Sequence, residues 1–340
     1  MKFKPLCLII TGLFINTVNA EVILDGFDSN VKNDVEITTQ DGIYSITQAQ
    51  GELRGSNLFH SFDKFNIDTN ETAAFSGSDS VQNIISRVTG GESTINGTIS
   101  SNIPSANLWL INPEGILFGD NAVLDIQGSF HASTADYIKL RDDVKYNAIT
   151  EVPILTSSPP QTFGFLDPIS TTARIDVGNA RLTVPENQSV TLLGSDISLQ
   201  GTLISAPGGN ISVVSINEAG EVIYSDQGLD TSTTDDFGRL SIDSTSFKIN
   251  GEQEGSIQIK GGDLEINSSD TDFVSSVTNL KASFFEDTDL MEKPCELADF
   301  YNQGKMSFIV NQDEDETEYG VKTKKNRRGP IGGAEAAECL

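Results

Sequence analysis

The chain contains one strand–glycine–strand pattern twice, as Leu124-Asp125-Ile126-Gln127-Gly128-Ser129-Phe130 and as Ile197-Ser198-Leu199-Gln200-Gly201-Thr202-Leu203. Each copy reads as a strand with alternating apolar residues, a glycine that permits a tight corner, and a second strand. Weaker copies occur at 95–99 and 248–251. A unit of this kind that repeats every ~20–25 residues is typical of a parallel β-helix, in which apolar side chains stack inward between coils.

Short β-rich runs separated by Gly, Asn, Ser, Asp and Pro continue along most of the chain. A β-sandwich also has many short strands and frequent turns, but the repeated unit favours the β-helix. We therefore predict an all-β parallel β-helix of about 12 coils with capped ends. The runs that we expect to bury one face and expose the other include 43–46, 181–184, 189–192, 211–214 and 256–259.

The charge balance excludes several classes of partner. The 340 residues include 49 Asp and Glu against 22 Lys and Arg, which gives a formal net charge of −27. A nucleic-acid binder needs a basic surface, and an anionic membrane would repel this chain. With 2 His and 3 Cys, a zinc site is not expected, and the sequence suggests no other metal and no cofactor.

The N-terminal segment has the pattern of a secretory signal peptide. Lys2 and Lys4 precede an apolar run at 6–15, and small residues lead to Ala20, after which we expect cleavage. Ten apolar residues would span only ~15 Å as a helix, too short for a membrane anchor. No later stretch approaches the ~18 apolar residues of a membrane span. Residues 1–20 are therefore predicted to direct export.

The composition of the chain changes toward its C-terminal part. Residues 167–284 are predicted to continue the β-helix, and 285–340 to form a charged, loosely ordered tail with one possible strand. Cys295 and Cys339 lie in this tail. If they pair, the closed loop would act as a stopper in the export channel that holds the protein at the cell surface. A plain stabilising bridge and two free thiols are the alternatives.

The most distinctive segment is a turn between two apolar runs. Asn112-Pro113-Glu114-Gly115 fits a type I turn, because Asn suits the first position, Pro the second and Gly the fourth. Ile116 begins the run that follows the turn.

On this turn the sequence resembles the N-terminal secretion domain of filamentous-haemagglutinin-like proteins, the exported partners in bacterial two-partner secretion (TPS). Residues 112–116 resemble the family motif Asn-Pro-Asn-Gly-Ile, with Glu114 in place of the second Asn. The stretches 81–91 and 128–134 also resemble the family, and the resemblance covers roughly 22–166. A second family motif, Asn-Pro-Asn-Leu, has no counterpart in this chain.

The resemblance implies a fold, a route and a role. The fold is a right-handed parallel β-helix, single-stranded and pectin-lyase-like, with an N-terminal cap and extra-helical hairpins. The domain at 21–166 would be recognised in the periplasm of a Gram-negative bacterium by an outer-membrane β-barrel transporter. The chain would cross unfolded and fold outside, each coil pairing with the one before it. Family members usually adhere to host cells, matrix or carbohydrate. We therefore expect a secreted or surface-held adhesin, and the alternative is a short secreted effector that uses the same export domain.

An enzyme is the alternative from another class, since β-helices also carry polysaccharide-degrading sites. Asp142-Asp143 and Asp235-Asp236 are the adjacent carboxylate pairs, and neighbours on a strand point to opposite faces. His60 and His131 lie far apart in the sequence, and no Ser-His-Asp or Cys-His arrangement is recognisable. The sequence therefore predicts a protein without catalysis.

Overall fold

The structure is a computed structural model that describes residues 21–27, 34–149, 152–166, 173–225, 227–253 and 255–267, and four short strands beyond them. This part of the chain is β-structure with a single turn of 3₁₀ helix, η1 (Gln48–Gln50). Among these residues, no helix is long and apolar enough to cross a membrane. Ala20, Cys295 and Cys339 lie outside the described residues.

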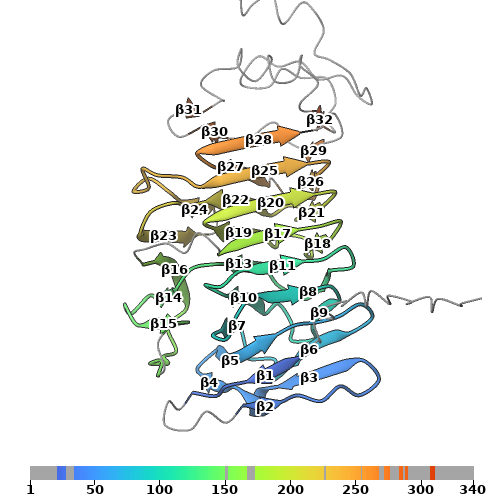
Figure 1. Cartoon of the computed structure of the whole chain (residues 1–340), viewed down its shortest axis with the longest axis vertical. Helices are drawn as coiled ribbons and strands as arrows, with labels where there is room; N and C mark the ends of the chain where they lie inside the picture. The colour runs from blue at the N-terminus through green and yellow to red at the C-terminus, as the bar shows by residue number, and fades with distance from the viewer. Residues whose placement is uncertain are drawn as a thin grey trace, which may run out of the picture.

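Three sheets wind around one core as a β-helix, with the coils stacked along the long axis of the molecule (Figure 1). Neighbouring coils pair in parallel, as predicted. Sheet A consists of β1 (Val22–Leu24), β2 (Val35–Glu36), β4 (Glu52–Arg54), β5 (Asn57–Phe65), β7 (Asn83–Val88), β10 (Asn107–Ile111), β13 (Phe130–Ser133), β19 (Val190–Gly194), β22 (Asn210–Ser215) and β27 (Ser256–Lys260).

Sheets B and C form the other two sides of each coil. Sheet B consists of β3 (Ile43–Thr47), β6 (Thr72–Ser76), β9 (Thr98–Ser101), β12 (Val123–Asp125), β18 (Arg181–Thr183), β21 (Leu203–Ser205), β26 (Ser246–Lys248), β29 (Asp272–Ser275) and β32 (Ser307–Val310). Sheet C consists of β8 (Ser93–Ile95), β11 (Ile116–Phe118), β17 (Arg174–Val177), β20 (Asp196–Gln200), β25 (Arg239–Asp243) and β28 (Asp263–Asn267).

The N-terminal end has the predicted cap. β1 runs antiparallel to both β2 and β5, and β4 folds back antiparallel on β5. The described part of sheet B has nine strands, fewer than the expected about 12 coils. Two excursions use chain that the prediction assigned to coils: one follows β13 and returns at β17, and the other follows β22 and returns at β25. The strand expected in the tail is present as β32.

A ladder of hydrogen bonds joins residues at, or directly before, the start of successive sheet A strands. Its steps cover 26, 24 and 22 residues in the early coils and 21 residues in a later one. These lengths agree with the predicted repeat of about 20–25 residues. Steps of 60 and 46 residues mark the two excursions. The ladder consists of Asn57, Asn83, Asn107, Ser129, Ser189, Asn210 and Ser256.

The repeated sequence pattern marks two different corners. In the copy at 124–130 the chain turns from sheet B into sheet A, whereas in the copy at 197–203 it turns from sheet C into sheet B. The copy at 95–99 makes the second kind of corner. Each coil has three corners, and a strand–glycine–strand pattern fits any of them. The pattern therefore predicts that two strands meet at a corner, but not which corner of the coil it is.

The two excursions form a fourth sheet, sheet D, which lies against the outer face of sheet A (Figure 1). It is antiparallel and confirms the expected extra-helical hairpins. Its strands are β15 (Lys145–Asn147), β14 (Tyr137–Leu140), β16 (Pro160–Phe165), β23 (Gly220–Ser225) and β24 (Gly228–Asp230), in that order.

Sheet D explains why sheet A is buried on both faces. The runs 189–192 and 211–214 were expected to expose one face, but Thr191, Ser212 and Val214 are buried. Strands of sheets B and C without such a cover, such as β21 and β20, bury alternate residues as predicted. The interior holds one apolar cluster from Val22 to Ile259 that continues past residue 166. The domain boundaries drawn from the sequence stay predictions.

Candidate functional site

The Asn112–Ile116 segment forms the corner between β10 in sheet A and β11 in sheet C. The Gly115 N–H donates to the Asn112 carbonyl oxygen at 3.1 Å, which closes the turn. Glu114, at the third position, does not have the positive φ that a type II turn would require there. The geometry is the one predicted for a type I turn.

The side chain of Asn112 ties this corner to the preceding coil. Its Oδ1 accepts the Glu114 N–H at 2.9 Å, and its Nδ2 donates to the Gly91 carbonyl oxygen and to Ser93 Oγ, both at 2.9 Å. The residue is fully buried, so each of these bonds replaces one to water. A shorter or acidic side chain would leave buried groups unpaired.

The other motif residues fit the same corner. Gly115 has a φ of 118°, and a Cβ there would lie 3.2 Å from the Arg174 carbonyl oxygen of the next coil, so glycine is favoured on both counts. Pro113 is buried. Ile116 is fully buried in the interior cluster and pairs with Ser93 on one side and Ile175 on the other.

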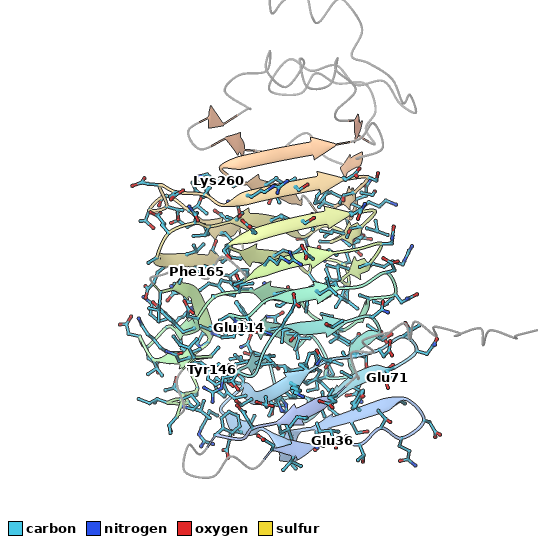
Figure 2. The ribbon with its side chains drawn as sticks, viewed as in Figure 1. Glu36, Glu71, Glu114, Tyr146, Phe165 and Lys260 are labelled. Carbon is cyan, nitrogen blue, oxygen red and sulfur yellow. The ribbon has the colours of Figure 1, made fainter. Side chains whose placement is uncertain are left out.

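Glu114 is the exposed member of the turn. It lies about halfway along the stack in Figure 2. Its backbone N–H is held by Asn112, whereas its carboxylate reaches solvent. The substitution of Glu for the family's second Asn therefore leaves the turn intact, and it changes the group that a partner would meet.

The two histidines do not form a site. His60 faces the interior, with its ring centroid 6.0 Å from that of Phe62 and 5.5 Å from that of Phe75. Neither ring nitrogen of His60 has a hydrogen-bond partner among the described residues, and burial lowers its pKa to about 3. His131 lies on the opposite face of sheet A, with its ring centroid 4.0 Å from that of Trp109. Burial lowers its pKa to about 3 as well.

The acidic pairs differ from expectation in their location. Asp142 and Asp143 occupy the turn between β14 and β15, and Asp235 and Asp236 precede β25. All four are exposed. The prediction placed both pairs on strands, where alternation would separate the two carboxylates. That reason is wrong, because turns and loops have no such alternation.

Two residues that organise the fold were missed by the sequence analysis. Arg87 lies fully buried between sheets A and D, and Gln258 reaches from β27 to the edge of sheet D. A signal for Arg87 exists, since a lone charge in the run Ile84-Ile85-Ser86-Arg87-Val88 is unusual for a strand with apolar residues on both faces. No comparable signal marks Gln258. Trp109 is buried and packs against Phe163 and Tyr224.

The fold and the turn define the chain as a β-helical protein with an Asn-Pro-x-Gly-Ile corner. The family model of the TPS secretion domain matches residues 20–270. The chain belongs to this two-partner secretion family. Its members are secreted through the TPS pathway, and an outer-membrane transporter is the partner that membership implies.

The chain is also similar to a solved secretion domain. The HMW1 secretion domain from Haemophilus influenzae is 19% identical, with 69% of this chain and 68% of that chain covered and a TM-score of 0.43. No curated protein matches the chain.

Proposed function

We propose that this TPS exoprotein is an adhesin that binds cells or surfaces and carries out no catalysis. The observation that supports this is the pair of solvent-facing sheets. Sheet D covers sheet A, whereas the outer faces of sheets B and C have no such cover in the described part of the chain. They present side chains at intervals of ~4.8 Å along the stack.

One outward-facing row of sheet B carries mostly small or polar side chains, with two charges among them. Ser45 pairs with Ala74, Ala74 with Ser100 and Ser100 with Asp125. Further along, Thr183 pairs with Ser205 and Ser205 with Lys248. These positions are exposed or half-buried. A regular row of mostly polar side chains suits many weak contacts with a repetitive target, since linked weak contacts give strong overall attachment. The support is for attachment and not for the chemistry of the receptor.

The test uses the purified full chain and variants of this face. Ser100→Lys with Ser205→Lys places two bulky cations on sheet B without touching the core. We expect attachment to epithelial cells, collagen and immobilised polysaccharide to fall by tenfold or more for any target that the wild type binds. The matched control is Ser225→Lys, at an exposed position of sheet D. Equal attachment of all three proteins would exclude sheet B as the binding face.

The enzyme alternative is tested on the same preparations. Release of reducing sugar or unsaturated products from pectin-type polysaccharides, at a rate that depends on protein concentration, would overturn the proposal. We expect none.

A further inference from the structure

A charged side chain lies inside the apolar contact between sheets A and D. Phe59, Ile85 and Trp109 project from β5, β7 and β10 toward sheet D and are buried. Arg87 lies on β7, on the same face as Ile85, and is only 1% exposed. A guanidinium in such a place destabilises the fold unless its donors are paired.

The partners of Arg87 come from both sheets. Its Nε–H donates to Ser61 Oγ on β5 at 2.7 Å, and Nη1 donates to the backbone carbonyl oxygen of Asn147 on β15. The guanidinium carbon lies 5.3 Å from the ring centroid of Tyr146, within the range of a cation–π contact. β15 therefore offers this cation a carbonyl acceptor and an aromatic face at adjacent residues.

The aromatic ring is itself fixed in place. The Tyr146 hydroxyl donates to the His60 carbonyl oxygen at 2.6 Å, and its ring lies 5.0 Å from that of Phe59, centroid to centroid. Together these contacts define one position of β15 over β5 and β7. A shift of β15 by one residue would turn Tyr146 away from the interface, because successive side chains point to opposite faces.

The residues that pair with Arg87 from sheet D arrive late in the chain. Asn147 is 60 residues after Arg87. While the chain emerges, the apolar face of β5, β7 and β10 is formed before its cover. Other apolar strands could cover it, either the same hairpin in a shifted register or a second copy of the chain. Most such covers would bury Arg87 without an acceptor.

We propose that Arg87 selects β15 as the strand that covers the first coils, by excluding covers that lack a carbonyl acceptor and an aromatic ring at this point. Apolar contact holds sheet D to sheet A, and Arg87 sets which strand docks and in which register. The role concerns assembly of the exported domain and is independent of what the mature protein binds.

The test replaces Arg87 by Met, which fills a similar volume without charge, in the full chain. Replacement of buried charges by apolar residues is often neutral or stabilising, so we expect the urea midpoint to be retained. After refolding, we expect at least tenfold faster amide exchange at Leu140 and Ala148, whose N–H groups bond within the hairpin region. Light scattering should detect oligomers, and Trp109, the single Trp of the chain, should become accessible to a quencher.

The matched control is Arg181→Met, an exposed arginine on β18 of sheet B. It should refold as a monomer with an unchanged hairpin. Arg87→Met that refolds as a monomer with Trp109 buried and the hairpin protected would overturn the proposal. If Arg87→Met does not fold, the test uses Arg87→Ala, which is refolded with ethylguanidinium added in place of the missing side chain. Recovery of the hairpin in ethylguanidinium, but not in ethylammonium, supports the proposal, and equal or absent recovery overturns it.

Discussion

The carboxamide of Gln258 makes hydrogen bonds with both backbone groups of Leu229: Oε1 accepts the N–H at 3.1 Å, and Nε2 donates to the carbonyl oxygen at 2.9 Å. Leu229 lies on β24, the edge strand of sheet D, and Gln258 lies on β27 of sheet A. The amide thus takes the place that another strand would occupy. At the opposite edge, Arg87 bonds the Asn147 carbonyl oxygen of β15. Occupied edges cannot recruit further strands at these points.

Gln258→Leu should destabilise the protein by about 1–3 kcal/mol, because the N–H and carbonyl of Leu229 then lose their partner. The measurement is urea unfolding followed by Trp109 fluorescence, with hydrogen exchange at Leu229 as a local readout. Gln253→Leu is the matched control, since Gln253 is exposed on a loop. Equal midpoints for the two variants would show that the carboxamide contributes nothing to the edge.

Asn112→Ala should cost about 2–3 kcal/mol, because the Gly91 carbonyl and Ser93 Oγ lose buried hydrogen bonds. Glu114→Asn, which restores the family motif, should change the free energy of unfolding by less than about 0.5 kcal/mol, since that side chain is exposed. Both values come from the same urea series. A large effect at Glu114, or none at Asn112, would contradict the structural account of this corner.

Pro113→Leu combined with Gly115→Val should reduce export while synthesis continues. The valine would have to adopt a φ of 118° and would crowd the Arg174 carbonyl, so the corner would open. The protein is blotted in the periplasm, on the surface and in the medium of cells with and without the transporter. Glu114→Gln is the control and should be exported normally. Full export of the double variant would separate secretion from the shape of this turn.

Acid should weaken the fold through His60 and His131. Burial lowers the pKa of both to about 3, whereas an unfolded histidine has a pKa of 6.5. Above pH 6.5 neither state binds a proton there, and between 6.5 and 3 only the unfolded chain does. Stability therefore falls as pH drops through this window, by about 2 kcal/mol per histidine at pH 5.

The urea midpoint at pH 7.5 and 5.5 measures this slope. Burial raises the pKa of Asp136 and Asp176, which opposes the trend at lower pH, so the higher range isolates the histidines. His60→Leu should remove about half of the slope. A variant whose midpoint shifts with pH as much as the wild type would show that His60 is not the group responsible.

The sequence predicts the coils of the β-helix but not that sheet D covers sheet A. A run such as 256–259 alternates because the strand has one interior face, and that periodicity is local. Whether the second face is also buried depends on sheet D, which is built from chain far away along the sequence: Phe163 meets Trp109. Thr191 and Ser212 therefore look solvent-facing in the sequence and are buried in the fold.

Part of the candidate site could be predicted from the sequence, and part could not. The turn at Asn112 could be predicted, because Asn, Pro and Gly fix backbone geometry by themselves. Its bonds to Gly91 and Ser93 could not, because they depend on the register between coils. For Glu114, its place in the turn predicts that a glutamate is tolerated there, and the structure adds that its carboxylate is exposed.

The hydrogen-bonded ladder from Asn57 to Ser256 makes the stack modular. Both excursions begin and end between neighbouring steps, so they are insertions into coils that would otherwise be continuous. Gain or loss of a whole coil would leave every other step in register and change the height by a fixed ~4.8 Å. The length of the β-helix can therefore change during evolution by whole coils. The coils that sheet D covers are the exception, because losing one of them would also disrupt the contact between sheets A and D.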